Sequence, residues 1–382
     1  MTDVVVAVLL LTAAGCAAWL LADLRTVPRC SVPSALAGSV SVVIPARNEE
    51  STLPTLLRSL RALPLGEVVV VNDASVDRTG EVARSGGATV LPATPPPPGW
   101  TGKAWACQIG ADATSGDRLL FLDADTVLEP HALAGLLALH ERHGGLVSVQ
   151  PFHRVERPYE QLSSYFNVMA LLASGAFTRT RSRRRRPMAF GPCLLTSRAD
   201  YEAMGGHAAV RGEILDDVRL AAAYDRAGLP VGCAVGGAAI RMRSYPGGLR
   251  QLADGWTKNF ASGAAAAAPG PALAAGTWIG AHHMVAVGAG LAVVEAATGR
   301  GSSLTYGSPL VWAVAWLGVA VQLGLILRRV GTFGWWTWSL FPVCLLAFDV
   351  IFARSTLHTM LRRSVRWRGR DVALRASVEE VR

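Results

Sequence analysis

The chain has 382 residues, enough for one large domain or two smaller ones, and 37 Lys and Arg against 28 Asp and Glu. Its net charge of +9 suits nucleic acid, an anionic membrane face or an anionic substrate, and only 17% of its residues are charged, below the roughly 25% of soluble domains. The six cysteines show no CxxC motif and no paired spacing, which excludes a disulfide framework and a zinc site.

The first apolar run, Val4–Ala22, is uncharged and about 19 residues long, the length that crosses a bilayer. A cleaved signal peptide is the alternative, but residues 1–3 lack the positive charge that begins such peptides. We therefore expect a retained anchor. Arg25 and Arg29 follow the run, so its carboxyl end should face the cytoplasm.

Strand-like and helix-like segments alternate between Val40 and Asp125. This alternation predicts an α/β domain with a mainly parallel sheet, in which ligands bind at the carboxyl ends of the strands. The expected strands are 39–46, 66–73, 88–92 and 118–125, and the expected helices are 48–64, 77–87 and 102–117.

Polar residues follow three of these strands: residues 46–49, Asp73, and the pair Asp123 and Asp125. A lone Asp-x-Asp is usually a turn, but three polar strand ends together favour a binding site. Two carboxylates can share Mg²⁺ or Mn²⁺ with the phosphate oxygens of a substrate. Lys103 is either a phosphate contact or a solvated lysine at a helix start.

Four segments resemble the signature blocks of family-2 glycosyltransferases with the GT-A fold: 40–50, 67–79, 102–126 and 213–229. Four others resemble the membrane-bound branch of that family that acts on carotenoid and hopanoid-type lipids: 95–107, 190–207, 254–260 and 367–370. The resemblance implies a GT-A-type, Rossmann-like α/β domain, mainly parallel in its sheet and flanked by transmembrane α-helices.

The resemblance also implies a nucleotide-sugar site. Asp73 would hydrogen-bond the base, Asp123 would lie near the ribose and the metal, and Asp125 would bind the metal on the diphosphate. The other residues expected at this site are Ala46, Asn48, Glu49 and Lys103.

Asp217 matches the general base of the family, and Asp216 stands where a Glu is more usual, so the choice between the two stays open. Independently, residues 214–228 read as an amphipathic helix with both acids in its first turn. The acids could simply complement the helix dipole. In an inverting transfer, one carboxylate takes the proton of the acceptor as its oxygen attacks the anomeric carbon.

Three further apolar segments, 277–297, 309–327 and 334–353, are candidate membrane spans. One anchor and three spans would place the basic tail outside, whereas the tail should be inside. Either one segment is re-entrant or interfacial, or residues 260–275 add a crossing. The arginine-rich run 178–187 is a solvated loop or contacts anionic lipid, and no recognition module supports nucleic acid.

Processive polysaccharide synthases of the superfamily carry a Gln-x-x-Arg-Trp motif that grips the growing chain. Here Trp256 is present but no Arg precedes it, which favours a single transfer. Trp256 and Lys258 are candidates for the acceptor site near the membrane, and a buried structural Trp is the alternative.

The sequence thus predicts a metal-dependent, inverting glycosyltransferase in the cell membrane, with several spans and a cytoplasmic catalytic domain. It would move one sugar from a nucleotide diphosphate sugar, with UDP as the expected nucleotide, to a membrane lipid. A processive polysaccharide synthase and a non-catalytic lipid-binding scaffold are the alternatives. The expected organisation is an anchor at 1–29, the catalytic domain at 30–245, an interfacial linker at 246–276, transmembrane helices at 277–353 and a basic tail at 354–382.

Overall fold

The computed structural model describes residues 2–31, 38–179, 187–213, 216–263, 268–299, 307–362, 364–367 and 370–373. The chain divides into two compact units. Most of the arginine-rich run lies outside the described residues. Unit 1 consists of Met1–Leu24, Val155–Arg183 and Tyr245–Leu357, and unit 2 of Arg25–Arg154, Arg184–Ser244 and His358–Arg382.

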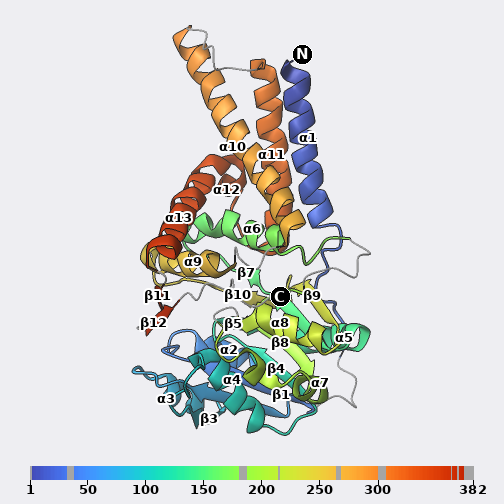
Figure 1. Ribbon diagram of the computed structural model, residues 1–382, viewed down its shortest axis with the longest axis vertical. Helices are drawn as coiled ribbons and strands as arrows, with labels where there is room; N and C mark the ends of the chain where they lie inside the picture. The colour runs from blue at the N-terminus through green and yellow to red at the C-terminus, as the bar shows by residue number, and fades with distance from the viewer. Residues whose placement is uncertain are drawn as a thin grey trace. The chain divides into compact units, whose positions relative to one another are not determined.

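Unit 2 is built on a seven-stranded sheet with the order β3-β2-β1-β4-β8-β6-β9 (Figure 1). Only β8 runs antiparallel to its neighbours in this sheet, which confirms the mainly parallel α/β prediction. The strands are β1 (Val40–Ala46), β2 (Glu67–Asn72), β3 (Thr89–Pro92), β4 (Arg118–Leu122), β6 (Leu146–Gln150), β8 (Cys193–Ser197) and β9 (Val231–Val235).

The helices of unit 2 follow the sequence pattern. In α2, for example, four leucines at helical spacing are all buried, because they face the sheet. A second sheet contains β5 (Thr126–Leu128), β10 (Ile240–Met242) and β7 (Phe152–His153), and β11 (Ser364–Trp367) pairs with β12 (Arg370–Ala373). The helices are α2 (Leu53–Leu60), α3 (Thr79–Ser85), α4 (Gly102–Asp112), α5 (Ala132–His143), α7 (Arg198–Ala203), η3 (Gly206–Val210) and α8 (Asp216–Arg226).

The register of the sheet brings its functional ends together. β1 pairs with β2 and with β4 in parallel, and Ala46 lies opposite Asn72. The chain therefore leaves β1, β2 and β4 at the same edge of the sheet, where the sequence predicted a ligand.

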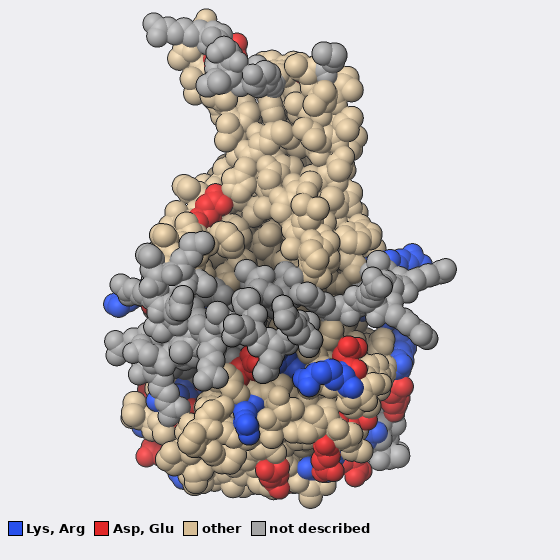
Figure 2. All heavy atoms as spheres, viewed as in Figure 1, with Lys and Arg blue, Asp and Glu red and all other residues tan. Residues whose placement is uncertain are grey.

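Unit 1 is helical, and three of its helices, α1, α10 and α11, are long and apolar enough to cross a membrane. They lie side by side in Figure 1, and Figure 2 shows few charged side chains on this face of them. Gln322 of α11 links all three, since it accepts from Trp278 Nε1 at 2.9 Å and donates to the carbonyl of Ala14 at 3.1 Å. The helices of the unit are α1 (Thr2–Leu20), η2 (Pro158–Ser163), α6 (Ser164–Ser174), α9 (Leu249–Gly263), α10 (Pro269–Thr298), α11 (Pro309–Val330), α12 (Trp335–Ser339) and α13 (Phe341–Arg362).

Two expectations about this unit need correction. Residues 269–276, expected in a linker, already belong to α10, because proline at the first turn of a helix has no amide hydrogen bond to lose. The continuous span expected over 334–353 is instead two helices that meet at Leu340, since Pro342 cannot continue the hydrogen bonding of α12.

Candidate active site

The loops after β1 and β2 form one rim of the candidate site. The Asn48 amide donates to Ser75 Oγ at 3.1 Å, and the Val76 amide donates to Asn48 Oδ1 at 2.9 Å. Asn48 and Ala74 both have positive φ angles, 55° and 48°. Such angles are unfavourable for residues other than glycine, so the two loops hold each other in a defined and strained shape.

Asp73 lies at the centre of this rim, with its carboxylate mostly buried. The Asp73 amide donates to the Ala46 carbonyl at 2.9 Å. The Asp73 carbonyl accepts from the Arg47 guanidinium at 3.0 Å. Glu49 is also buried, and its carboxylate accepts from the Thr52 hydroxyl at 2.6 Å. The rim is therefore preorganised, with Glu49 engaged in holding its own loop.

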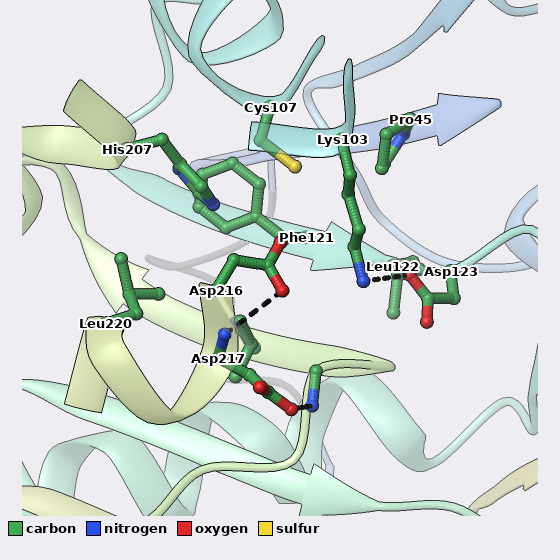
Figure 3. A pocket seen from close by; sticks show the side chains of 12 residues that line it. Pro45, Lys103, Cys107, Phe121, Leu122, Asp123, His207, Asp216, Asp217 and Leu220 are labelled. Carbon is green, nitrogen blue, oxygen red and sulfur yellow. Dashed lines mark hydrogen bonds and ion pairs between the residues drawn. The ribbon is translucent and has the colours of Figure 1, made fainter. Parts of the chain in front are cut away.

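A pocket lies beside this rim, and Figure 3 shows its side chains converging from α4, β4, η3 and α8. It brings together four residues that the sequence predicted: Lys103, Asp123, Asp216 and Asp217. The Lys103 ammonium lies 2.8 Å from Asp123 Oδ1. The complete lining is Pro45, Lys103, Cys107, Phe121, Leu122, Asp123, Gly191, Leu194, His207, Asp216, Asp217 and Leu220.

Local structure explains how Lys103 and Asp123 reach the pocket. Thr101 caps α4 by accepting from the Ala104 amide, which places Lys103 in the first turn of that helix. Asp123 is the first residue after β4, and its amide donates to the Pro192 carbonyl at 3.0 Å. Although burial opposes it, the charges of Asp123 and Asp216 raise the pKa of Lys103 well above its usual value. Lys103 is thus a permanent cation.

Two backbone amides hold the carboxylate of Asp217, which lies in the first turn of α8. Its Oδ2 accepts from the Gly191 amide and its Oδ1 from the Val218 amide, each at 2.9 Å. The neighbouring Asp216 accepts from the Asp217 amide at 3.1 Å. Burial and the charge of Asp216 raise the pKa of Asp217 to about 6, against the opposing effect of Lys103. A carboxylate with that pKa is ionised at neutral pH and is a stronger base than an ordinary aspartate.

Gly191 and His207 are pocket residues that sequence reasoning missed. A Cβ atom at Gly191 would lie 3.2 Å from Asp217 Oδ2 and 3.4 Å from Lys103 Nζ, so glycine allows this loop to approach both groups. His207 is buried. The sequence feature that could have pointed to it is the pair Gly205 and Gly206 directly before it, because both glycines adopt positive φ angles.

The predicted metal ligands were Asp123 and Asp125. Asp125 is half-buried on the turn that follows β4, close in sequence to Asp123 but outside the lining of the pocket. Within the described ranges, no group of three or more His, Cys, Asp or Glu could hold a metal ion. The two carboxylates of Asp123 and Asp125 fit a hard cation that completes its shell with phosphate oxygens and water, rather than an ion enclosed by protein.

The two predicted acceptor residues, Trp256 and Lys258, belong to α9 in unit 1. Trp256 is buried: its ring stacks on Phe166 at a centroid distance of 4.9 Å, and its Nε1 donates to Ser163 Oγ at 3.0 Å. These contacts fit the structural alternative for Trp256. Lys258 is half-buried on the same helix.

Comparison with known proteins fits this geometry. The model of the family described as Glycosyl transferase family 2 matches residues 41–205. The chain is 33% identical to 4,4'-diaponeurosporenoate glycosyltransferase of Staphylococcus haemolyticus over 345 residues, 88% of this chain and 89% of that protein. It is also 33% identical to the protein of that name from Staphylococcus aureus over 342 residues, 88% of each chain.

Among solved structures, a mannosyltransferase from Pyrobaculum calidifontis in complex with GDP-Man and Mn²⁺ aligns over 92% of this chain and 99% of that chain, with 19% identity and a TM-score of 0.49. The relatives define the protein as a glycosyltransferase. The chain belongs to glycosyl transferase family 2, and the named relatives confirm its predicted resemblance to the carotenoid branch.

Proposed function

We propose that this glycosyltransferase moves a single sugar from a nucleotide diphosphate sugar to a membrane lipid of the carotenoid type, with inversion at the anomeric carbon. The observation that carries the proposal is the position of Asp217, a half-buried carboxylate beside Asp216 in the same pocket as the Lys103–Asp123 pair. Base and cation thus lie at one site, as a displacement by a hydroxyl group at the anomeric carbon requires.

In the proposed reaction, the acceptor oxygen forms a bond to the anomeric carbon while the bond from that carbon to the diphosphate breaks. If the acceptor is a hydroxyl, Asp217 takes its proton. If it is a carboxylate, as in the acceptor that the relatives' printed name describes, no proton is removed and Asp217 orients the attacking group. Lys103 stabilises the negative charge that develops on the departing diphosphate.

A divalent cation, Mg²⁺ or Mn²⁺, would be held by Asp123 and Asp125. When bound, it supplies further positive charge to the leaving diphosphate. The rim formed by Ala46, Asn48 and Asp73 would hold the nucleotide, with Asp73 on the base and UDP as the expected nucleotide.

The proposed topology has three crossings, α1, α10 and α11. Residues 25–244 then lie on the same side as the carboxyl end of α11. The positive-inside rule makes that side cytoplasmic, because Arg25, Arg29, Arg328 and Arg329 flank the spans there, whereas Arg300 alone is charged between residues 299 and 308.

The helices after α11 support a re-entrant path in place of a fourth crossing. Trp316 Nε1 of α11 donates to the Ser339 carbonyl at 3.0 Å, so α12 turns back beside α11. Further along α13, Arg354 pairs with Asp254 of the amphipathic helix α9, which precedes the start of α10. This path returns the basic tail to the cytoplasmic side. A fluorescent protein fused after residue 382 should then fluoresce, and one inserted at residue 304 should not; the reverse pattern contradicts this topology.

On the acceptor side, we propose that Lys258 of α9 approaches the polar end of the lipid near the membrane surface, while Trp256 supports the helix from within. Lys258 is a cation on a helix whose exposed side carries polar residues, as at membrane interfaces.

The proposal is tested by incubating membranes that contain the enzyme with radiolabelled nucleotide sugars and then extracting them with organic solvent. Label in one discrete lipid band supports single transfer. Label only in a solvent-insoluble polymer would favour a processive synthase, and absence of both transfer and sugar-nucleotide hydrolysis would favour a non-catalytic scaffold.

A further inference from the structure

His207 is a polar group of the pocket that the reaction described above does not use. It lies in η3, its side chain is buried, and it faces the same pocket as Lys103 and Asp217. In Figure 3 its ring extends from η3 toward the space beside Phe121 and Asp216. The ring packs against the Phe121 ring at a centroid distance of 4.9 Å, so its orientation is fixed.

The Tyr201 hydroxyl fixes the protonation of this ring. It accepts from the His207 amide at 3.0 Å, donates to Gln108 Oε1 at 3.3 Å and lies 2.9 Å from His207 Nδ1. Because its one hydrogen goes to Gln108, we assign the hydrogen of the neutral ring to Nδ1, which donates to the phenol oxygen, so that Nε2 is an acceptor. Burial and the charge of Lys103 lower the pKa of His207 to about 3, which keeps the ring neutral at working pH.

The Nε2 atom of His207 forms no hydrogen bond to the residues that the structure describes. Around it, the lining offers carboxylates, which only accept, the ammonium of Lys103, and apolar groups such as Leu194 and Leu220. The sugar of a bound donor is attached to the diphosphate, so it must lie next to Lys103. Its hydroxyls need acceptors, and Nε2 can accept where Asp123 and Asp217 are already bound to Lys103 and to two backbone amides.

We propose that His207 is a specificity-determining residue for the donor sugar, whose Nε2 accepts a hydrogen bond from one sugar hydroxyl. This inference rests on the proposed use of a nucleotide diphosphate sugar. A pocket built to accept from a hydroxyl discriminates against a sugar that lacks it or points it elsewhere, because the buried acceptor is then left without a partner. Tyr201 is the positioning residue that keeps the ring hydrogen on Nδ1 and so leaves Nε2 able to accept.

The test begins by screening the wild-type enzyme with UDP-glucose, UDP-galactose, UDP-N-acetylglucosamine and GDP-mannose. The kcat/KM of the best donor and of its monodeoxy analogues is then measured for wild type and for His207→Leu. We expect His207→Leu to lower kcat/KM for the complete sugar about tenfold, the usual effect of one neutral hydrogen bond. With the wild type, kcat/KM for one deoxy analogue should be lower than for the complete sugar by about the same factor. With His207→Leu, removing that hydroxyl should lower kcat/KM little further.

Three variants serve as controls. His207→Gln keeps an amide oxygen that can accept near the position of Nε2 and should retain most of the discrimination. His207→Asn, whose shorter side chain does not reach that position, should lose it and replaces His207→Leu if the latter does not fold. His140→Leu removes another buried imidazole outside the pocket and should leave every kcat/KM ratio unchanged.

Equal losses with every deoxy analogue in wild type and in His207→Leu would overturn the role of His207 while leaving the proposed function intact. A wild-type enzyme that neither transfers nor hydrolyses any of the four donors would overturn both.

Discussion

The two units of the chain differ in where like charges meet. In unit 1, Asp254 pairs with Arg354, and Asp349 forms hydrogen bonds with His283 Nε2. In unit 2, the pocket that holds the Lys103–Asp123 pair also places Asp216 beside Asp217, so that like charges meet in a partly buried site. The pairs in unit 1 join helices. In unit 2, the charge of Asp216 destabilises the ionised form of Asp217 and makes that carboxylate more basic. This contrast distinguishes Asp217 from the two paired acids of unit 1.

The largest expected effect comes from Asp217→Asn. It removes the proposed base and keeps the size of the side chain, so transfer to a hydroxyl acceptor should fall about 1000-fold, within the usual range for general-base catalysis. Donor binding, measured by titration with the nucleotide, should change little. A loss of donor affinity as large as the loss of rate would instead place Asp217 in the donor site.

Asp125→Ala should have the next largest effect. Loss of one of two protein ligands should weaken metal binding and lower kcat about 100-fold at limiting Mg²⁺ or Mn²⁺, because less charge is supplied to the leaving diphosphate. Binding of Mn²⁺ in the presence of UDP, followed by electron paramagnetic resonance, checks the metal independently of turnover. Unchanged Mn²⁺ binding would refute the assignment.

Lys258→Gln tests whether unit 1 contributes more than structure. Loss of a half-exposed charge should raise the KM for the lipid acceptor by up to about fivefold, the effect of roughly 1 kcal/mol, without changing the KM for the donor. Trp256→Phe is its control on the same helix, because it removes the hydrogen bond to Ser163 and should reduce stability but not acceptor affinity. If only Trp256→Phe raises the acceptor KM, the two roles are exchanged.

Asp254→Asn should have the smallest effect on turnover, and it is the same chemical change as Asp217→Asn in the other unit. The ion pair with Arg354 is about 40% exposed on both sides, so its loss should cost less than about 1 kcal/mol. We expect turnover to change less than about twofold and the melting temperature to fall by about 2 °C. A large loss of turnover with unchanged melting temperature would remove the contrast between the units.

The parts of this site that could be predicted are those set by local sequence. Each of β1, β2 and β4 is a buried run that ends in polar residues, and Asp217 lies in the first turn of a helix with a clear amphipathic pattern. Since parallel strands end at one edge, their order along the chain was enough to predict that Asp73 and Asp123 lie at the same edge.

The remaining parts depend on contacts between distant segments. Gly191 and His207 reach the pocket through the loop before β8 and the turn after α7, whose paths no local pattern fixes. In unit 1, the path of α12 and α13 depends on the contact of Trp316 with Ser339 and on the pairing of Arg354 with α9, so hydropathy alone could not predict that this segment forms two helices.

The role proposed for Asp217 in unit 2 is that of a base whose pKa is raised by burial and by Asp216. The pH dependence of kcat/KM with a hydroxyl acceptor tests it most directly, because the base must be ionised to accept the proton. With the pKa of Asp217 at about 6, kcat/KM should be nearly constant just above neutral pH and should fall about tenfold for each pH unit below 6. A profile that stays flat down to about pH 4.5 would mean an aspartate with an ordinary pKa, and would contradict the account.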